Sequence, residues 1–210
     1  MSQAKTTSQS RSFWLKQLHQ WHWISSAICL VGMILFAATG ITLNHAALIE
    51  AKPKVISKEA VLPADMITAL GVNAPAEKGP LQEPVAKWIG KTMKIDVTGR
   101  EGEWSEDEVY VALTRPGGDA WLSVDRVTGD IAYEKTTRGA ISYLNDLHKG
   151  RNTGTAWMWF LDVFAVACLV FCITGLCLLQ MHAGARPSTW PMVGLGIVIP
   201  LVLVILFIHS

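Results

Sequence analysis

Charged residues are scarce outside one central segment of this chain. Residues 46–155 contain 14 of the 18 Lys and Arg residues and 16 of the 17 Asp and Glu residues. The rest of the chain has only five charged residues, namely Lys5, Arg11, Lys16, Asp162 and Arg186. This uneven distribution excludes a single soluble globular domain and a disordered chain. A formal net charge of +1 and the lack of a basic stripe also argue against a nucleic-acid partner.

The central segment also lacks cysteine, and the chain lacks the motifs of several enzyme classes. All four cysteines lie in long apolar runs, so the segment contains no disulfide. The absence of Cys-x-x-Cys-His excludes covalent c-type haem attachment. No phosphate loop or dinucleotide fingerprint is present in the segment, so it shows no nucleotide-binding motif. It also has no paired zinc-ligand motif.

Three long apolar runs are present, at residues 24–43, 156–181 and 190–208. About 20 apolar residues in a helix cross a hydrocarbon core of roughly 30 Å. We therefore predict a mainly α membrane protein with three transmembrane helices and a small α+β insert. The predicted parts are a cytoplasmic tail (1–23), a first helix (24–45), the insert (46–155), a second helix (156–182), a cytoplasmic loop (183–189) and a third helix (190–208).

The short segments that flank these runs predict the orientation. The N-terminal tail has three basic residues and no acidic residue, and the loop at 183–189 has only Arg186. The positive-inside rule places both in the cytoplasm, so the insert lies in the periplasm of a bacterial inner-membrane protein. A cleaved signal peptide is the alternative for the first run. That run is long for a signal peptide, however, and residues 44–47 form a poor cleavage site.

Within the insert, the sequence predicts one amphipathic helix followed by an antiparallel sheet. The helix is expected over residues 56–70, with an interruption at Pro63. Turn residues at 115–119 and 126–130 connect consecutive strands. The expected strands are residues 93–98, 109–114, 121–124 and 131–134.

Histidine is absent between residues 46 and 147, and its six positions cluster at the membrane faces. The predicted orientation places His19, His22 and His182 inside, and His45, His148 and His209 outside. Two histidines at one depth on antiparallel helices suit the axial ligands of a non-covalent b-type haem. The predicted ligand pairs are His22 with His182 and His45 with His148, and His19 is the substitute for His22. The alternative is that each histidine is an ordinary interfacial residue.

Two further features lie inside the predicted spans. The pattern Thr-Gly-x-x-Leu occurs at residues 39–43 and again at 174–178, which suggests an inverted repeat. The alternative is a common packing dipeptide of membrane helices. Asp162 is the only charge within a predicted span and is a functional candidate for that reason. Its alternative role is an ion pair with Arg151 or an interaction with a helix end.

Several motifs occur in an order that resembles a known family. They are Leu-His-x-Trp-His-Trp (18–23), the first Thr-Gly-x-x-Leu (39–43), Val-Asp-Arg-Val-Thr-Gly-Asp-Ile (124–131), Leu-His-Lys-Gly (147–150) and Leu-Asp-Val-Phe (161–164). From about residue 13 to residue 182, the chain resembles the PepSY-associated transmembrane family. The insert would then be a PepSY-like module.

This resemblance implies a function. Some members of the family are inner-membrane b-haem proteins that reduce ferric siderophores in the periplasm. For this chain it implies one or two haems b, held by His22, His45, His148 and His182. It also implies a ferric chelate or its periplasmic carrier as electron acceptor, and a quinol or cytoplasmic reductase as donor. With only three spans, a homodimer or larger complex is an open alternative to a chain that holds both haems alone.

Two other functions compete with this ferric reductase. The insert alone is a candidate binding or inhibitory module, with the spans as its membrane anchor, but an anchor does not need facing histidine pairs. A metal or proton transporter is a further alternative. A single intramembrane carboxylate and the lack of a polar pathway through three spans argue against it.

Overall fold

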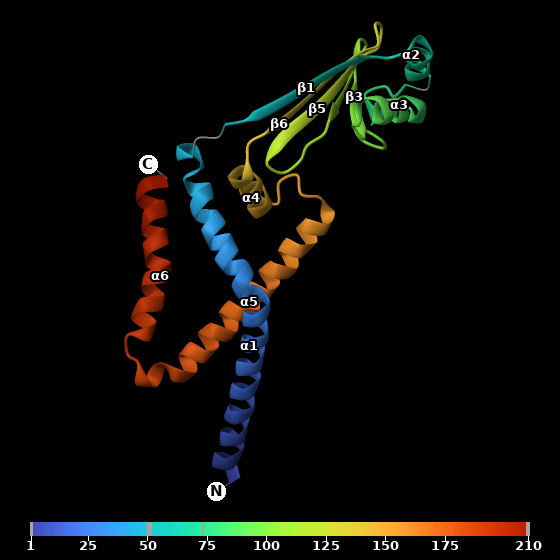
Figure 1. Cartoon of the computed structure of the whole chain (residues 1–210). Helices are drawn as coiled ribbons and strands as arrows, with labels where there is room; N and C mark the ends of the chain where they lie inside the picture. The colour runs from blue at the N-terminus through green and yellow to red at the C-terminus, as the bar shows by residue number, and fades with distance from the viewer. Residues whose placement is uncertain (1, 50–51, 73, 209–210) are drawn as a thin grey trace. The chain divides into compact units, whose positions relative to one another are not determined.

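The computed structural model describes residues 2–49, 52–72 and 74–208. The chain divides into two compact units, which we call the helical unit (Met1–Leu35 and Trp159–Ser210) and the sheet unit (Phe36–Met158). Helix α1 (Ser2–Asn44) and helix α5 (Thr155–His182) each contribute residues to both units. Figure 1 shows these helices in blue and orange.

The helical unit also contains a third apolar helix. It consists of α6 (Thr189–Leu203) and the π-helical turn η3 (Val204–Ile208), which follow the short η2 (Ala183–Ala185). Three segments are long and apolar enough to cross a membrane, with mean hydropathies of 2.2, 2.5 and 2.8: Ser10–Asn44, Thr155–Ala185 and Thr189–Ile208. Their side chains are largely exposed, as lipid-facing helices require. The protein is therefore a membrane protein.

Helices α1 and α5 pack closely where the side chains are small. A Cβ atom placed on Gly32 would overlap the ring of Phe164, so a larger residue there would have to displace that ring. Cys29, which is close to Gly32 in the sequence of α1, is fully buried. Ser25 of α1 and Thr174 of α5 are also buried. Without a hydrophobic force between helices in lipid, such close contacts provide the packing energy.

The sheet unit contains six antiparallel strands in the order β1-β6-β5-β4-β3-β2. The strands are β1 (Lys54–Val61), β2 (Lys78–Pro80), β3 (Glu101–Trp104), β4 (Glu108–Ala112), β5 (Gly118–Asp125) and β6 (Asp130–Thr137). The helical elements are η1 (Ala46–Leu48), α2 (Ala64–Gly71), α3 (Glu83–Met93) and α4 (Ala140–Lys149).

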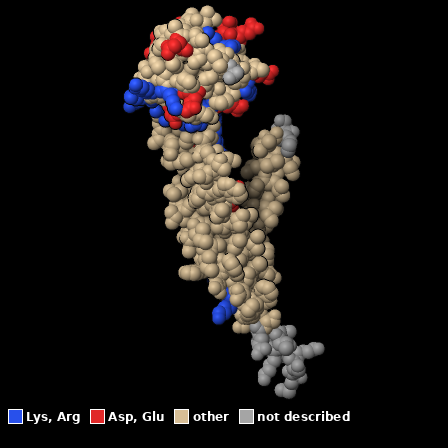
Figure 2. Space-filling view, turned by 90° about the vertical axis from the view of Figure 1, so that its right-hand side faces the viewer, with Lys and Arg blue, Asp and Glu red and all other residues tan. Residues whose placement is uncertain are grey.

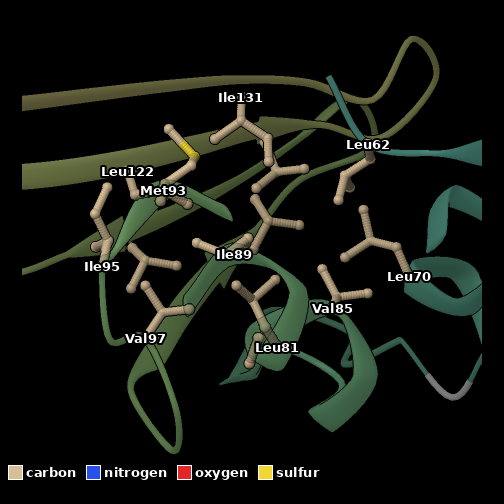
Figure 3. Close-up of a cluster of buried hydrophobic side chains, with 14 of the residues drawn as sticks. Leu62, Leu70, Leu81, Val85, Ile89, Met93, Ile95, Val97, Leu122 and Ile131 are labelled. Carbon is tan, nitrogen blue, oxygen red and sulfur yellow. The ribbon is translucent and has the colours of Figure 1, made fainter. Parts of the chain in front are cut away.

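The hydrophobic core lies between one face of this sheet and helices α2 and α3 (Figure 3). Val85, Ile89 and Met93 repeat every four residues on α3, so they share one buried face. Leu122 and Val124 alternate with partly exposed residues along β5, as a sheet with one covered face requires. Trp104 closes the core and donates its Nε1–H to the carbonyl of Gly79 at 2.9 Å.

The charges of the protein are gathered on the sheet unit, whereas the long helices carry almost none (Figure 2). Its ion pairs, such as Lys78 with Glu103 at 3.3 Å, join exposed side chains and contribute little stability. We infer that the charges keep this unit in water rather than hold it together.

Two sequence predictions for the insert are wrong. Residues 54–61 form strand β1 rather than the first half of a helix, and only Ala64–Gly71 is helical. Pairing with β6 along the whole of β1 outweighs the helical periodicity that these residues also show. The strand predicted at 93–98 is the end of α3 followed by a loop. Ile95 and Val97 alternate inward from that loop, which imitates the pattern of a strand.

The other three predicted strands are confirmed as β4, β5 and β6, although each boundary differs by a few residues. The predicted α+β insert is therefore present. The fold class and the three long apolar helices also agree with the prediction from the sequence. Helices α3 and α4 and strands β2 and β3 were not predicted from the sequence.

Candidate functional site

His22 lies on α1 and contacts α5 within the helical unit. Its Nδ1 is 3.2 Å from the carbonyl oxygen of Phe171 and 3.0 Å from Oγ1 of Thr174. The imidazole ring stacks on the Phe171 ring with centroids 4.6 Å apart and an interplanar angle of 17°. A Cβ atom on Gly175 would lie 3.3 Å from Cε1 of His22, so the glycine leaves room for the ring.

His148 lies on α4 and contacts α1 within the sheet unit. Its Nδ1 is 2.7 Å from Oγ1 of Thr39. The ring of Phe36 lies 5.0 Å from the imidazole at 45°, and a Cβ on Gly40 would be 3.6 Å from Cε1. Asn145, one turn earlier on α4, accepts a hydrogen bond from Thr42 at 2.9 Å. Two hydrogen bonds therefore hold α4 against α1.

His22 and His148 thus lie in two similar surroundings. Each is formed by the pattern Phe-x-x-Thr-Gly, at residues 171–175 for His22 and at residues 36–40 for His148. Positions i, i+3 and i+4 lie on one face of a helix, so Phe, Thr and Gly surround the incoming ring together. The repeated Thr-Gly is part of the predicted inverted repeat, whereas the phenylalanine three residues before it was not predicted. The partner histidines could not be found from the repeat because they come from other helices.

The hydrogen bonds indicate the neutral tautomer of His22. Among the described residues, Nδ1 of His148 has the Thr39 hydroxyl as its hydrogen-bond partner, and a hydroxyl can donate or accept. Nδ1 of His22 also lies 3.2 Å from the carbonyl oxygen of Phe171, which can only accept, so this nitrogen carries the hydrogen. In a neutral imidazole, the lone pair is then on Nε2, the atom available to bind a metal.

His19 and His182 face each other in the helical unit. Their ring centroids are 6.2 Å apart at an interplanar angle of 89°. Nδ1 of His19 donates to the carbonyl of Leu15, and that of His182 to the carbonyl of Leu178, both at 2.8 Å. Neither Nε2 atom bonds to a described residue.

His19, His22 and His182 together line a pocket of about 510 Å³, with Gly175 and Arg186. Imidazole nitrogen is a common ligand of iron, so these three histidine side chains have donor atoms that suit an iron-containing group such as haem. His22 is held on the wall of the same pocket by Thr174.

The structure does not bring His45 to His148. His45 is exposed, and its Nδ1 donates to the carbonyl of Ile41 in its own helix at 2.9 Å. No ring contact or hydrogen bond joins the two among the described residues. Their pairing stays a prediction.

The remaining candidates show no binding geometry. Asp162 is exposed on α5 and makes no hydrogen bond or ion pair with a described residue of its unit. His209 lies outside the described residues. The described part of the chain contains no group of three or more His, Cys, Asp or Glu side chains that could hold a bare metal ion. A haem needs fewer protein ligands, because the porphyrin nitrogens bind the iron as well.

A comparison with protein families decides the family of the chain. The family model described as PepSY_TM-like matches residues 13–209. The chain belongs to this family. The match includes α1 from residue 13 onward, the other two apolar helices, the sheet unit and every candidate histidine. The comparisons with curated proteins and with solved structures found no match.

Membership of the PepSY_TM-like family confirms the resemblance seen in the motifs and the expected membrane protein with a PepSY-like insert. In this PepSY_TM-like protein, the sequence motifs Leu-His-x-Trp-His-Trp and Leu-His-Lys-Gly carry three of the histidines described above. They are His19, His22 and His148.

Proposed function

We propose that this membrane protein is a b-haem electron-transfer protein that reduces chelated ferric iron. The observation that supports haem is the set of histidines whose Nδ1–H is donated and whose Nε2 is left for a metal. Helix-derived imidazoles of this kind are the usual axial ligands of b-type haem in helical bundles. The family resemblance supports ferric iron as the acceptor.

In the helical unit, His182 and either His19 or His22 would hold one haem. In the sheet unit, His148 would hold a second, with His45 as its predicted partner. A bound haem supplies a one-electron ferric–ferrous couple. The other roles belong to the chain itself. Thr174 and Thr39 orient the rings through hydrogen bonds to Nδ1, and Phe171 and Phe36 pack against the rings.

Arg186 lines the pocket with the three histidines and provides a positive charge there. A guanidinium binds carboxylates well because its planar fork matches their two oxygens. We infer that Arg186 pairs with a carboxylate of the ligand in this pocket.

The proposed reaction loosens the bond between iron and its chelate. Hard oxygen ligands bind Fe(III) far more tightly than Fe(II), so one-electron reduction favours release of the metal. The proposed orientation places the sheet unit in the periplasm, where it would meet the chelate or its carrier. The electron donor would be a quinol or a cytoplasmic reductase, since the sequence shows no flavin or nicotinamide motif.

The test is an absorption spectrum of the detergent-purified protein, oxidised and then reduced with dithionite. We expect a low-spin b-type spectrum, quantified as pyridine haemochrome. His182→Ala should remove the signal of one haem and His148→Ala that of the other. Val127→Ala, at an exposed turn, is the control and should keep both. Haem-free protein from cells supplied with a haem precursor would contradict the proposal.

A second candidate is a binding module without redox activity. The face of the sheet opposite the core carries Tyr110 and Trp121, whose rings stack at 6.1 Å and 22°, and Tyr110 is exposed. Such an aromatic pair is suited to a partner protein or a small apolar ligand. Protein without haem that still binds a partner through this face would favour this function.

A further inference from the structure

The sheet unit contains a pocket of about 430 Å³ beside the end of helix α1. Its wall is formed by the last turn of α1, by η1 and by α4. Four basic side chains line it, from parts of the chain that are distant in sequence: Lys52, Arg138, Lys149 and Arg151. Asp146 is the only acidic residue of the lining.

Part of this positive charge is uncompensated among the described residues. Asp146, whose Oδ2 accepts the backbone N–H of Gly117 at 2.8 Å, provides one negative charge in the lining. Arg138 pairs with Asp119 outside the lining. The side chains of Lys52, Lys149 and Arg151 have no ion pair with any described residue. The described lining therefore has a net positive charge, in a segment that has more acidic than basic residues.

A buried amide adds a second observation. Asn145 lines the pocket and is 7% exposed. Its Oδ1 accepts the hydroxyl of Thr42, whereas its Nδ2 has no hydrogen-bond partner among the described residues. With its oxygen already hydrogen-bonded, this amide presents its N–H donors to the pocket, and a ligand with acceptor oxygens suits them.

The rest of the wall is apolar and belongs to a membrane helix. Leu43, Ala46 and Ile49 line the pocket from its α1 side, and the apolar segment of α1 ends at Asn44. The basic groups therefore lie where a hydrocarbon-crossing helix leaves the bilayer. Basic pockets at this depth attract anionic lipid headgroups, while adjacent apolar side chains contact the glycerol and acyl region.

We propose that this pocket binds the phosphate of an anionic phospholipid headgroup. Lys52, Lys149 and Arg151 provide the charge, and Asn145 donates a hydrogen bond to a phosphate oxygen. The bound lipid would contact both α4 and the end of α1 and would stabilise the packing between them. His148 is a residue of α4. The inference does not depend on haem, because none of these groups is a proposed haem ligand.

The test is native mass spectrometry of the full chain, purified in detergent and mixed with equal amounts of dioleoyl phosphatidylglycerol and dioleoyl phosphatidylcholine. The wild type should retain phosphatidylglycerol in preference. Lys149→Gln with Arg151→Gln should lower this preference about tenfold or more, since each basic residue near the surface contributes to attraction of anionic lipid. Lys87→Gln with Lys91→Gln on α3 removes the same charge elsewhere and should leave it unchanged.

Asn145→Asp is a second variant that tests the pocket if the double variant does not fold. It keeps the size of the side chain but replaces a donor by an anion, so it should also lose phosphatidylglycerol. Equal retention of both lipids by the wild type, or equal losses in the α3 control, would overturn the proposal. So would displacement of the lipid by millimolar inorganic phosphate, which would assign the pocket to a soluble oxyanion. The pocket variants could instead lose haem while they bind lipid as the wild type does. That result would assign the basic pocket to the carboxylates of haem.

Discussion

Thr39 and Thr174 orient the histidine rings that they contact. Oγ1 of Thr39 lies 2.7 Å from Nδ1 of His148, and Oγ1 of Thr174 lies 3.0 Å from Nδ1 of His22. A metal ligand whose other nitrogen is hydrogen-bonded is oriented and more basic. At the residue scale, these threonines are therefore positioning residues for the proposed ligands.

With His22 as a ligand of the proposed haem, Thr174→Val should weaken haem retention in the helical unit about tenfold or more, the usual effect of removing a group that orients a metal ligand. Thr174→Ser keeps the hydroxyl and should restore it. The measurement is haem loss to apomyoglobin, together with the electron paramagnetic resonance g-values, which report ring orientation. Thr39→Val should change the other haem only. Unchanged g-values in Thr174→Val would contradict the role assigned to this hydroxyl.

Asp125 makes the stability of the sheet unit depend on pH. Its carboxylate accepts the backbone N–H groups of Thr128 and Val127 in the turn after β5, and these bonds hold its pKa below the ordinary value of 3.8. The folded state thus binds the proton less readily than the unfolded state. The stabilisation is complete above the unfolded pKa and is lost as the pH falls through the folded pKa.

Asp125→Ala should therefore lower the thermal midpoint of the sheet unit at neutral pH, and the difference from wild type should shrink as the pH falls below 3.8. Circular dichroism of β-structure in detergent measures both midpoints. Glu106→Ala, at an exposed position between β3 and β4, should have little effect at any pH. A difference that stays constant down to the lowest pH would show that the carboxylate charge is unimportant.

At the scale of elements, the packing of α1 on α5 depends on Gly32. Any Cβ there would collide with the ring of Phe164, and that ring is packed against Phe160. Gly32→Leu should force the helices apart and reduce the haem content of the helical unit, because His182 is carried by α5 and His19 by α1. Gly194→Leu on α6, where an added Cβ would have no atom within 4 Å, is the matched control. Full haem content in Gly32→Leu would contradict this dependence.

The contact of α3 with the sheet stabilises the whole insert. Leu122 is fully buried beneath α3, so Leu122→Ala should lower the free energy of unfolding by about 2–5 kcal/mol through lost burial and a residual cavity. Val127→Ala, at a side chain that is 73% exposed, should change it by less than about 0.5 kcal/mol. Urea titration of the full chain in detergent, followed by the circular dichroism of the sheet, compares the two variants.

At the scale of the whole molecule, the orientation in the membrane follows from the flanking charges. We expect Val127→Cys in the sheet unit to react with a membrane-impermeant maleimide on intact spheroplasts, and Ser188→Cys to react only after lysis. Both are made after replacement of the four native cysteines by alanine. The positive-inside rule gives the physical reason, since it predicts that the loop with Arg186 is cytoplasmic. The reverse pattern of labelling would invert the proposed direction of electron flow.

Much of the fold could be predicted because it depends on local patterns. Run length alone predicted three apolar helices, and alternation predicted the strands that became β4, β5 and β6. Helix α3 was missed because Pro84 and the nearby glycines are typical of a loop, although Pro at the start of a helix is favourable. Strand β1 was mistaken for helix because its residues also fit a helical period, and only pairing with β6 decides between them.

The sequence by itself determined the membrane class, the separation of charged and apolar segments, the family and the histidines worth testing. Those features are encoded in neighbouring residues and need no knowledge of the fold. Tertiary structure decided which partner each histidine meets. His148 contacts a threonine 109 positions away, His22 contacts one 152 positions away, and His19 rather than His22 faces His182. Contacts between helices depend on the rotation and depth of each helix, which packing sets and local sequence does not.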